Sequence, residues 1–250
     1  MKLLFDLDGT LYHGTKVVSE AIELINHLHK TKQQFGFITN NSSRTPLENV
    51  QHMEKLGFSN IKPEQFFNSA IACVAYLKEN ITGNKVHVIG KNGLRSELLN
   101  NGYDIVDEYA DIVVVGSNGD ANYLDYSLGC RNLYQGAKLV GTNNDRIFMS
   151  EDGIKCGTGA VVNMLAYSAN QTPIITGKPT KIYIDYALKH FGYQSSEVMI
   201  VGDNLETDIL CGINSGIKTC LVLGGTHNQE DIERLNIKPS MIINDLSKLI

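Results

Sequence analysis

Short apolar runs alternate along this chain with segments whose apolar residues recur at helical spacing. The runs at 2–5, 35–38 and 198–201 have the length of strands, and the segments at 19–30 and 180–190 carry the helical spacing, with Ser19 as the expected N-cap of the first segment. Two parallel strands need a long crossover between them, which is usually a helix, so this order is typical of β-α units. It predicts an α/β fold built on a parallel sheet.

The middle of the chain carries a second series of the same kind. At 250 residues the protein exceeds the common domain size of about 100–150 residues. Within the middle we expect strands at 86–89, 112–115 and 139–140, and helices at 93–100, 123–134 and 158–169. The first pattern returns with a strand at 174–175. We therefore predict a sheet domain formed by residues 1–79 and 174–250, with a second α/β domain inserted at 80–173.

Charge and composition exclude several classes of partner. The 22 basic and 27 acidic residues give a net charge of −5, which provides no basic surface for nucleic acid or for an anionic membrane. No stretch approaches the roughly 20 apolar residues of a membrane span, and acidic residues interrupt the N-terminus before a signal peptide develops. The five cysteines include no C-x-x-C pair, which argues against a disulfide framework and a zinc site. We expect a cytoplasmic protein.

Acidic residues follow two of the predicted strands. Asp6 and Asp8 come after the run at 2–5, and Asp203 and Asp208 come after the run at 198–201. In open parallel sheets, ligands bind beyond the carboxyl ends of the strands, so these side chains can converge on one site. Oxygen ligands on short stems suit a small hard cation such as Mg²⁺. The alternatives are a polar turn at Asp6–Asp8 and simple helix capping by the second pair.

Two further strand ends add a hydroxyl and a positive charge. Thr39 follows the run at 35–38, and Lys178 follows the run at 174–175. A hydroxyl donor and an ammonium group beside carboxylates form a place for a phosphoryl group. Each residue alone is ordinary for a loop, so the prediction depends on their joint order.

The sequence resembles the haloacid dehalogenase superfamily phosphatases in four ordered motifs. These are DLDGT at 6–10, TN at 39–40, TGKP at 176–179 and GDNLETD at 202–208. The inserted part resembles the class II cap of the NagD-like and p-nitrophenyl phosphatase branch, on the segments GTNND at 141–145 and CGTG at 156–159. The resemblance implies a Rossmann-like core with an inserted α/β cap that covers the site and selects the substrate.

The resemblance also implies a role for each motif residue. Asp6 becomes the nucleophile, Asp8 the general acid and base, and Thr39 and Lys178 stabilise the phosphoryl oxygens. Mg²⁺ is expected on Asp6, on the backbone carbonyl of Asp8 and on Asp203, with Asp208 supporting the site. Asn40, Lys178 and four cap residues are the expected substrate contacts; the cap residues are Asn143, Asp145, Gly157 and Gly159. For the cap residues, an ordinary polar loop and a helix N-terminus are the alternatives.

The expected reaction is hydrolysis of a small phosphorylated metabolite of the sugar phosphate or nucleotide class through an aspartyl phosphate. A phosphorylation switch of the receiver type and a phosphomutase on the same core are the alternatives. Asp8 and the large insertion favour the phosphatase over the receiver domain. A homodimer is compatible with the resemblance, because similar proteins form dimers through their caps.

Overall fold

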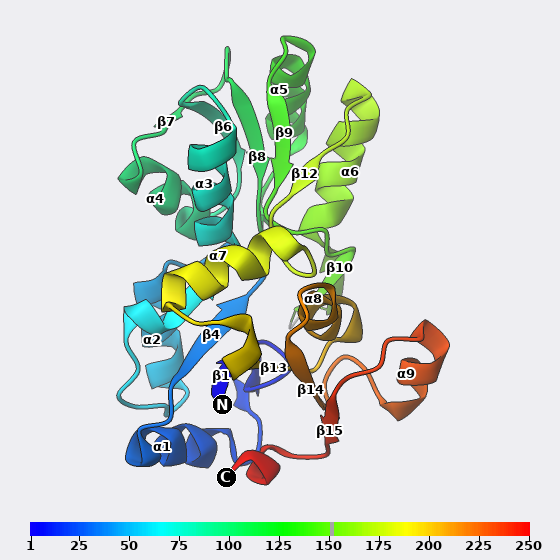
Figure 1. The fold of residues 1–250 in the computed structure, drawn as a ribbon. Helices are drawn as coiled ribbons and strands as arrows, with labels where there is room; N and C mark the ends of the chain where they lie inside the picture. The colour runs from blue at the N-terminus through cyan, green and yellow to red at the C-terminus, as the bar shows by residue number, and fades with distance from the viewer. Residues whose placement is uncertain (151–152) are drawn as a thin grey trace. The chain divides into compact units, whose positions relative to one another are not determined.

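The computed structural model describes residues 1–150 and 153–250, which form two compact units (Figure 1). The first unit comprises residues 1–39, 46–67 and 178–250, and the second comprises residues 40–45 and 68–177. Each unit is built around its own parallel sheet with helices packed against it. The predicted α/β fold, with a parallel-sheet core and an inserted second unit, is confirmed.

The first sheet has the strand order β15-β14-β13-β1-β4-β5. Its strands are β1 (Lys2–Phe5), β4 (Phe35–Thr39), β5 (Phe66–Asn68), β13 (Val198–Gly202), β14 (Lys218–Val222) and β15 (Met241–Ile243). The accompanying helices are α1 (Ala21–Thr31), α2 (Pro46–Lys55), α7 (Lys181–Phe191), α8 (Leu210–Asn214) and α9 (Gln229–Leu235). Short elements complete the unit: β2 (Tyr12–His13), β3 (Lys16–Val17), η1 (Pro63–Gln65), η2 (Ser195–Glu197), η3 (Leu205–Ile209) and η4 (Leu246–Leu249).

Strand β1 lies at the centre of this sheet between β4 and β13. Phe5 pairs with Phe37 of β4 on one side and with Val201 of β13 on the other. Because all three strands are parallel, the residues that follow them emerge at one edge of the sheet. This register brings residues near both ends of the chain together at that edge.

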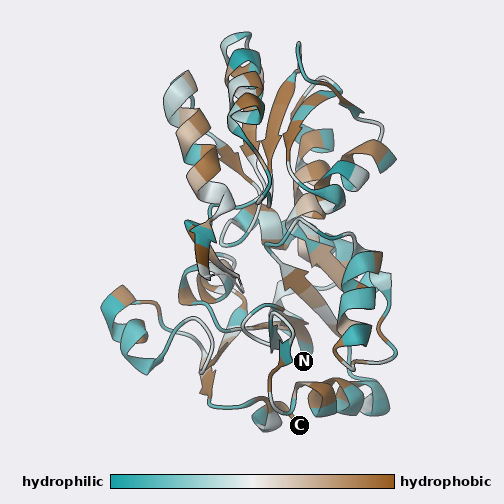
Figure 2. Cartoon of the chain, turned by 180° about the vertical axis from the view of Figure 1, so that it is seen from behind, coloured by the Kyte–Doolittle hydropathy of each residue, from teal (hydrophilic) through white to brown (hydrophobic). Residues whose placement is uncertain are grey.

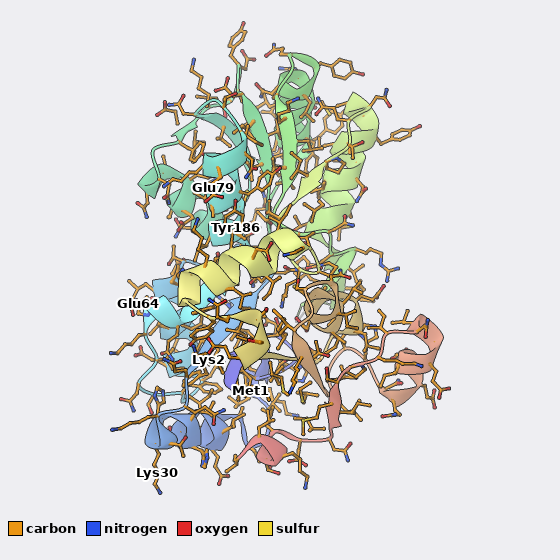
Figure 3. All side chains as sticks on the ribbon, viewed as in Figure 1. Met1, Lys2, Lys30, Glu64, Glu79 and Tyr186 are labelled. Atoms are coloured by element: carbon orange, nitrogen blue, oxygen red, sulfur yellow. The ribbon has the colours of Figure 1, made fainter. Side chains whose placement is uncertain are left out.

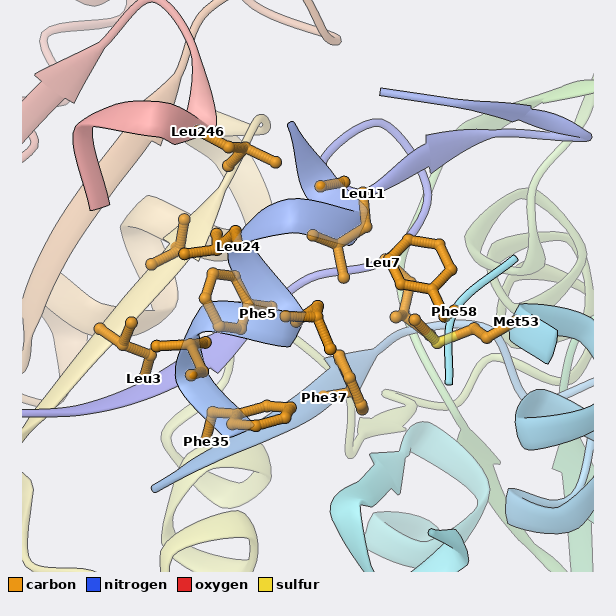
Figure 4. Close-up of a cluster of buried hydrophobic side chains, with 14 of the residues drawn as sticks. Leu3, Phe5, Leu7, Leu11, Leu24, Phe35, Phe37, Met53, Phe58 and Leu246 are labelled. Atoms are coloured by element: carbon orange, nitrogen blue, oxygen red, sulfur yellow. The ribbon is translucent and has the colours of Figure 1, made fainter. Parts of the chain in front are cut away.

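Apolar side chains on one face of the first sheet form its main core. Leu3, Phe5, Phe35 and Phe37 pack there against Leu24 and other residues of α1, as Figure 4 shows. Residues two apart along a strand share a face, so the spacing of Leu3 and Phe5 accounts for their common side. Burial of such large side chains contributes about 1.5–3 kcal/mol each, which holds the strand ends in a fixed arrangement.

The second sheet has the order β12-β9-β8-β6-β7. Its strands are β6 (Lys85–Ile89), β7 (Asp104–Ile105), β8 (Ile112–Val115), β9 (Lys138–Gly141) and β12 (Ile174–Ile175), and a hairpin of β10 (Ile147–Ser150) and β11 (Gly153–Cys156) lies outside it. Four helices flank the sheet: α3 (Ser69–Asn80), α4 (Asn92–Asn100), α5 (Tyr123–Tyr134) and α6 (Thr158–Ala169). Alternate strand residues pack against α3 and α4 or against α5 and α6, so both faces are covered. Figure 2 accordingly shows strands that are mostly hydrophobic and helices of mixed hydropathy.

Two details of the sequence prediction are wrong. Ile174–Ile175 was expected in the first sheet, but β12 pairs with β9 and lies at the edge of the second sheet. Ser19 was expected to cap α1, whereas the N-cap is Glu20, with a left-handed backbone and no side-chain capping bond. Helix α3 packs with the second sheet, and the domain boundaries at residues 79–80 and 173–174 stay a prediction.

Candidate active site

Three buried carboxylates lie together at the edge of the first sheet. Asp6 directly follows β1, Asp203 directly follows β13, and Asp208 lies in the π-helical turn η3. One carboxylate oxygen from each residue lies within 4.8 Å of the other two. Asp203 and Asp208 are 1% exposed and Asp6 is 7% exposed. The predicted convergence of acidic residues from the two ends of the chain is therefore present in the structure.

A buried lysine bridges two of these carboxylates. The Nζ of Lys178 lies 2.6 Å from Oδ1 of Asp6 and 2.6 Å from Oδ1 of Asp208. Lys178 lies between β12 and α7, where the chain re-enters the first unit, and not at the end of a strand of the first sheet as predicted. Charge-assisted hydrogen bonds of this kind are about twice as strong as neutral ones. They hold Asp6 and Asp208 in a defined orientation.

The pKa values of these groups reflect burial and their mutual charges. Burial raises the pKa of Asp6 well above its usual range, and the nearby Asp208 adds to this, while Lys178 opposes it. Burial also raises the pKa of Asp208, which Lys178 again opposes. Burial alone would lower the pKa of Lys178, but Asp208 and Asp6 outweigh it and the pKa lies well above its usual range. Lys178 therefore remains a cation. Its single positive charge does not balance the negative charges of the carboxylates around it when they are ionised.

The third carboxylate, Asp203, is held by groups that the sequence reasoning missed. Thr10 donates its hydroxyl to Oδ1 of Asp203 at 3.0 Å, and the backbone N–H of Thr226 donates to Oδ2 at 2.6 Å. Gly9 has a φ of +97°, and a Cβ there would lie 2.3 Å from Oδ2 of Asp203. Only glycine combines this backbone with so close an approach. The Gly-Thr pair after Asp8 was the available signal for part of this arrangement.

Asp8 and Thr39 lie near the same edge with different burial. Asp8 is exposed in the turn after β1, where it forms an isolated bridge with Tyr12. Thr39 is 4% exposed at the end of β4. Their predicted roles toward a phosphoryl group stay predictions.

The three carboxylates of the site suit a divalent cation, both in their charge and in their donor atoms. If Asp6, Asp203 and Asp208 are ionised, three negative charges face the one positive charge of Lys178, an excess of two. Their donor atoms are all carboxylate oxygens, which are the ligands that hard divalent cations prefer. A cation among them would offset the unfavourable ionisation that burial imposes on Asp6 and Asp208.

In the second unit, Asn40, Asn143 and Asp145 bind one another. The amide of Asn40 donates to both carboxylate oxygens of Asp145 at 3.2 Å. Asn143 is 2% exposed; its amide donates to the carbonyl of Asn40 at 2.9 Å and its Oδ1 accepts from the N–H of Asp145 at 3.1 Å. These contacts hold the loop after β9 against the segment that follows Thr39. That these three residues contact substrate stays a prediction.

Gly157 and Gly159 pack against the same loop. Their N–H groups donate to the carbonyls of Arg146 and Asp145 at 2.9 Å. A Cβ on Gly157 would lie 2.1 Å from the carbonyl oxygen of Asp145, so the loop leaves no room for a side chain there. These backbone donors are thus engaged within the second unit, and a contact with substrate stays a prediction.

The second unit also has a pocket of about 440 Å³. Ser43, Lys91, Asn92, Asn118 and Asp120 contribute to its wall. Lys91 and Asp120 form an ion pair across 3.2 Å within it. None of the second-unit residues predicted to contact substrate lines this pocket.

The fold and the site define a class of α/β enzyme whose buried carboxylates suit a divalent cation. The family model described as haloacid dehalogenase-like hydrolase matches residues 3–104, and a second model, described as HAD-hydrolase-like, matches residues 175–249. Together they contain every carboxylate of the site. The chain belongs to the haloacid dehalogenase-like hydrolase family, in its NagD-like branch. Hydrolases of this family generally use a divalent metal.

Named relatives match the chain over nearly its whole length. The 5'-nucleotidase YutF of Bacillus subtilis is 34% identical over 99% of this chain and 96% of its own length. The acid sugar phosphatase of Staphylococcus epidermidis is 36% identical over 99% and 95%. The structure of NagD from E. coli K-12 has a TM-score of 0.90 at 29% identity, over 99% of this chain and 97% of that chain.

Within the part of the chain that the structure describes, every helix is too short or too polar to cross a membrane. The cytoplasmic location and the homodimer stay predictions.

Proposed function

We propose that this protein is a phosphoric monoester hydrolase that cleaves small phosphorylated metabolites in a magnesium-dependent reaction. The observation that carries the proposal is the buried group of Asp6, Asp203 and Asp208, with Lys178 bridging two of its members. The named phosphatases among its relatives support this reaction. Their names include a nucleotidase and a sugar phosphatase, so nucleotides and sugar phosphates are the proposed substrate classes.

The reaction proceeds in two displacements at phosphorus. A carboxylate oxygen of Asp6 forms a bond to phosphorus while the bond to the leaving oxygen breaks, and Asp8 donates a proton to that oxygen. Asp8, now a carboxylate, takes a proton from a water molecule that attacks the aspartyl phosphate. Inorganic phosphate leaves, and both aspartates return to their starting states. The exposure of Asp8 suits a group that exchanges protons with the leaving group and with water.

The other residues of the site orient the nucleophile and stabilise the charge of the phosphoryl group. Lys178 orients Asp6 through its 2.6 Å hydrogen bond and carries a positive charge toward the phosphoryl oxygens. Thr39 supplies a hydroxyl donor from the end of β4. Asp6, Asp203 and the carbonyl of Asp8 would hold Mg²⁺, with Asp208 beside them. The bound cation supplies the positive charge that lets an anionic carboxylate approach an anionic phosphate.

Substitution of the nucleophile tests the proposal. We expect the wild-type protein to release inorganic phosphate from p-nitrophenyl phosphate and from a panel of nucleotides and sugar phosphates when Mg²⁺ is present. Asp6→Asn keeps the shape of the side chain but removes the nucleophile, so turnover should fall by about 10³-fold or more. Asp185→Asn on the exposed face of α7 is the matched control and should keep its activity.

A folded Asp6→Asn variant with near-normal turnover would exclude Asp6 as the nucleophile. The Asp8→Asn variant provides a second readout. p-Nitrophenolate leaves without protonation, so the first step should proceed in this variant and the aspartyl phosphate should accumulate. Acid quenching followed by intact-mass measurement should detect the added phosphoryl group.

A further inference from the structure

Tyr183 on α7 is a fully buried tyrosine to which the proposed mechanism assigns no role. Its side chain is 0% exposed. Its hydroxyl lies 2.8 Å from the carbonyl oxygen of Phe67 and 3.2 Å from that of Thr39. A phenol has one proton, so the two carbonyls share this donor. The hydroxyl thereby joins the end of β4 to the neighbouring strand β5 in the first sheet.

The segment that carries Tyr183 also carries Lys178. Thr180 caps α7 between them, because its hydroxyl accepts from the N–H of Tyr183 at 3.3 Å. The Nζ of Lys178 lies 3.5 Å from the carbonyl oxygen of Ile38, and the hydroxyl of Tyr183 contacts the next carbonyl, that of Thr39. One short segment therefore contacts two successive carbonyls at the end of β4 while it also orients Asp6.

Helix α7 approaches β4 closely at a second point. A Cβ on Gly36 would lie 2.7 Å from the ring of Phe191, so β4 has no room for a side chain there. The ring of Phe67 contacts that of Tyr183 edge-on, with centroids 5.3 Å apart. Packing alone would accept phenylalanine at 183, which makes the buried hydroxyl a polar group with a specific partner. Burial raises the pKa of Tyr183, which favours the protonated hydroxyl that donates to the carbonyls of Phe67 and Thr39.

We propose that Tyr183 is a positioning residue, whose hydroxyl fixes the backbone of Thr39 and thereby directs the Thr39 side chain toward the phosphoryl group. This inference rests on the proposed function, in which Thr39 stabilises charge that develops in the transition state. Small displacements of such a donor reduce turnover more than they reduce substrate binding. Loss of the Tyr183 hydroxyl should therefore act on kcat and leave KM nearly unchanged.

A double-mutant cycle tests the inference. The variants are Tyr183→Phe, Thr39→Val and their combination, with Tyr186→Phe on the same helix as the control (Figure 3). Kinetics with p-nitrophenyl phosphate and Mg²⁺ give kcat and KM, and denaturation curves give the folded fraction used to normalise kcat. In the wild-type background, Tyr183→Phe should lower kcat by about 10-fold, with KM changed less than about 2-fold, because Tyr183 acts through a transition-state contact. In the Thr39→Val background, the same substitution should lower kcat by less than about 2-fold, because the contact of the Thr39 hydroxyl with the phosphoryl group is already absent.

Two results would overturn the inference while the proposed function stands. One is a normalised kcat of Tyr183→Phe equal to that of Tyr186→Phe. The other is an equal loss in both backgrounds, which would mean that Tyr183 acts through packing only. A wild-type protein that releases no phosphate from any monoester would instead reject the proposed function, and the inference with it.

Discussion

The two units of this protein end their parallel strands in polar residues, but the polar groups differ in kind. In the first unit, buried charges meet at the edge of the sheet: Asp6 and Asp203 directly follow strands, and Asp208 and Lys178 join them from neighbouring segments. In the second unit, the groups around the loop after β9 pair with one another, the carboxylate of Asp145 among them. The hydroxyl oxygens of Ser42 and Thr142 lie 3.4 Å apart. The side-chain amide of Asn143 donates to the carbonyl of Asn40 and accepts from the N–H of Asp145.

This difference separates what the architecture provides from what the residue types provide. A parallel sheet gathers side chains at the carboxyl ends of its strands in either unit. Donors and acceptors that match one another, as in the loop after β9, form hydrogen bonds that hold the loop in place. Buried like charges leave an excess that a cation or a substrate can neutralise. The carboxylate of Asp145 differs from those of the first unit in this respect, because both of its oxygens accept from the amide of Asn40.

The largest expected effect comes from removing the buried positive charge. Lys178→Met should lower kcat/KM by about 10²–10³-fold, since one electrostatic donor to a transition state contributes about 2.7–4 kcal/mol. Lys181→Met is the matched control; its ammonium pairs with Asp185 on the exposed surface of α7. An exposed pair of this kind contributes at most about 1 kcal/mol to stability, so that variant should keep nearly full activity. Equal activities of the two variants would contradict the role of the buried charge.

Magnesium should stabilise the protein through the first unit only. At about 100 times its Kd, a ligand adds about 2.7 kcal/mol, and each kcal/mol raises Tm by about 2–4 °C for a chain of this size. Thermal unfolding with Mg²⁺ and with EDTA should show this shift in the wild type and in Asp145→Asn. Asp203→Asn should lose most of the shift, because it removes a proposed ligand. A full shift in Asp203→Asn would place the cation elsewhere.

Residues of the second unit should affect the choice of substrate more than the metal. Asp145→Ala removes the partner of the Asn40 amide and frees the loop after β9. We expect the ratio of kcat/KM between a nucleotide and a sugar phosphate to change by about 10-fold, as for a few altered pocket contacts. The Mg²⁺ concentration for half activity should stay the same. An unchanged substrate profile would remove Asp145 from the specificity site.

The smallest expected effects are two pH dependences of opposite sign, one in each unit. Partial desolvation lowers the pKa of His190, an exposed residue of the first unit, from 6.5, so the unfolded chain binds a proton more readily and acidification below about 6.5 reduces stability. Burial raises the pKa of Glu97 in the second unit from 4.5, so its contribution to stability is lost as the pH rises above about 4.5.

The variants His190→Gln and Glu97→Gln should separate these two contributions. Between pH 7.5 and 4.5, each Tm curve should depart from that of the wild type by about 1 °C, in opposite directions, as expected for groups that are partly solvated. Curves parallel to the wild type would show that neither group contributes.

Much of the fold followed from the sequence because its strands are buried on both faces. Runs such as those of β1, β8 and β13 are continuously apolar, and their ends are marked by glycine or aspartate. The pairing partner of a strand is not encoded locally. Two isoleucines at 174–175 suit the edge of either sheet, so β12 was assigned to the wrong one.

The carboxylates of the site could be predicted because Asp6 and Asp203 directly follow strands, and Asp208 lies in the turn after β13 within the same motif as Asp203. Residues that hold them from other elements could not be predicted in the same way. Thr226 contributes only its backbone N–H to Asp203, which any residue except proline could supply. Tyr183 matches the apolar spacing of α7, so its hydroxyl was not distinguished from ordinary packing. In both cases the information lies in contacts between elements that are distant along the chain.

The glycines around Asp203 limit how this enzyme can be altered. A side chain at Gly9 or at Gly225 would come within 2.4 Å of that aspartate, so neither position accepts even alanine without displacing it. Mutant libraries aimed at new specificity should leave these two backbone positions unchanged. The loop around Asn143 and Asp145 offers a separate place for variation, since changes there leave the carboxylates of the first unit intact.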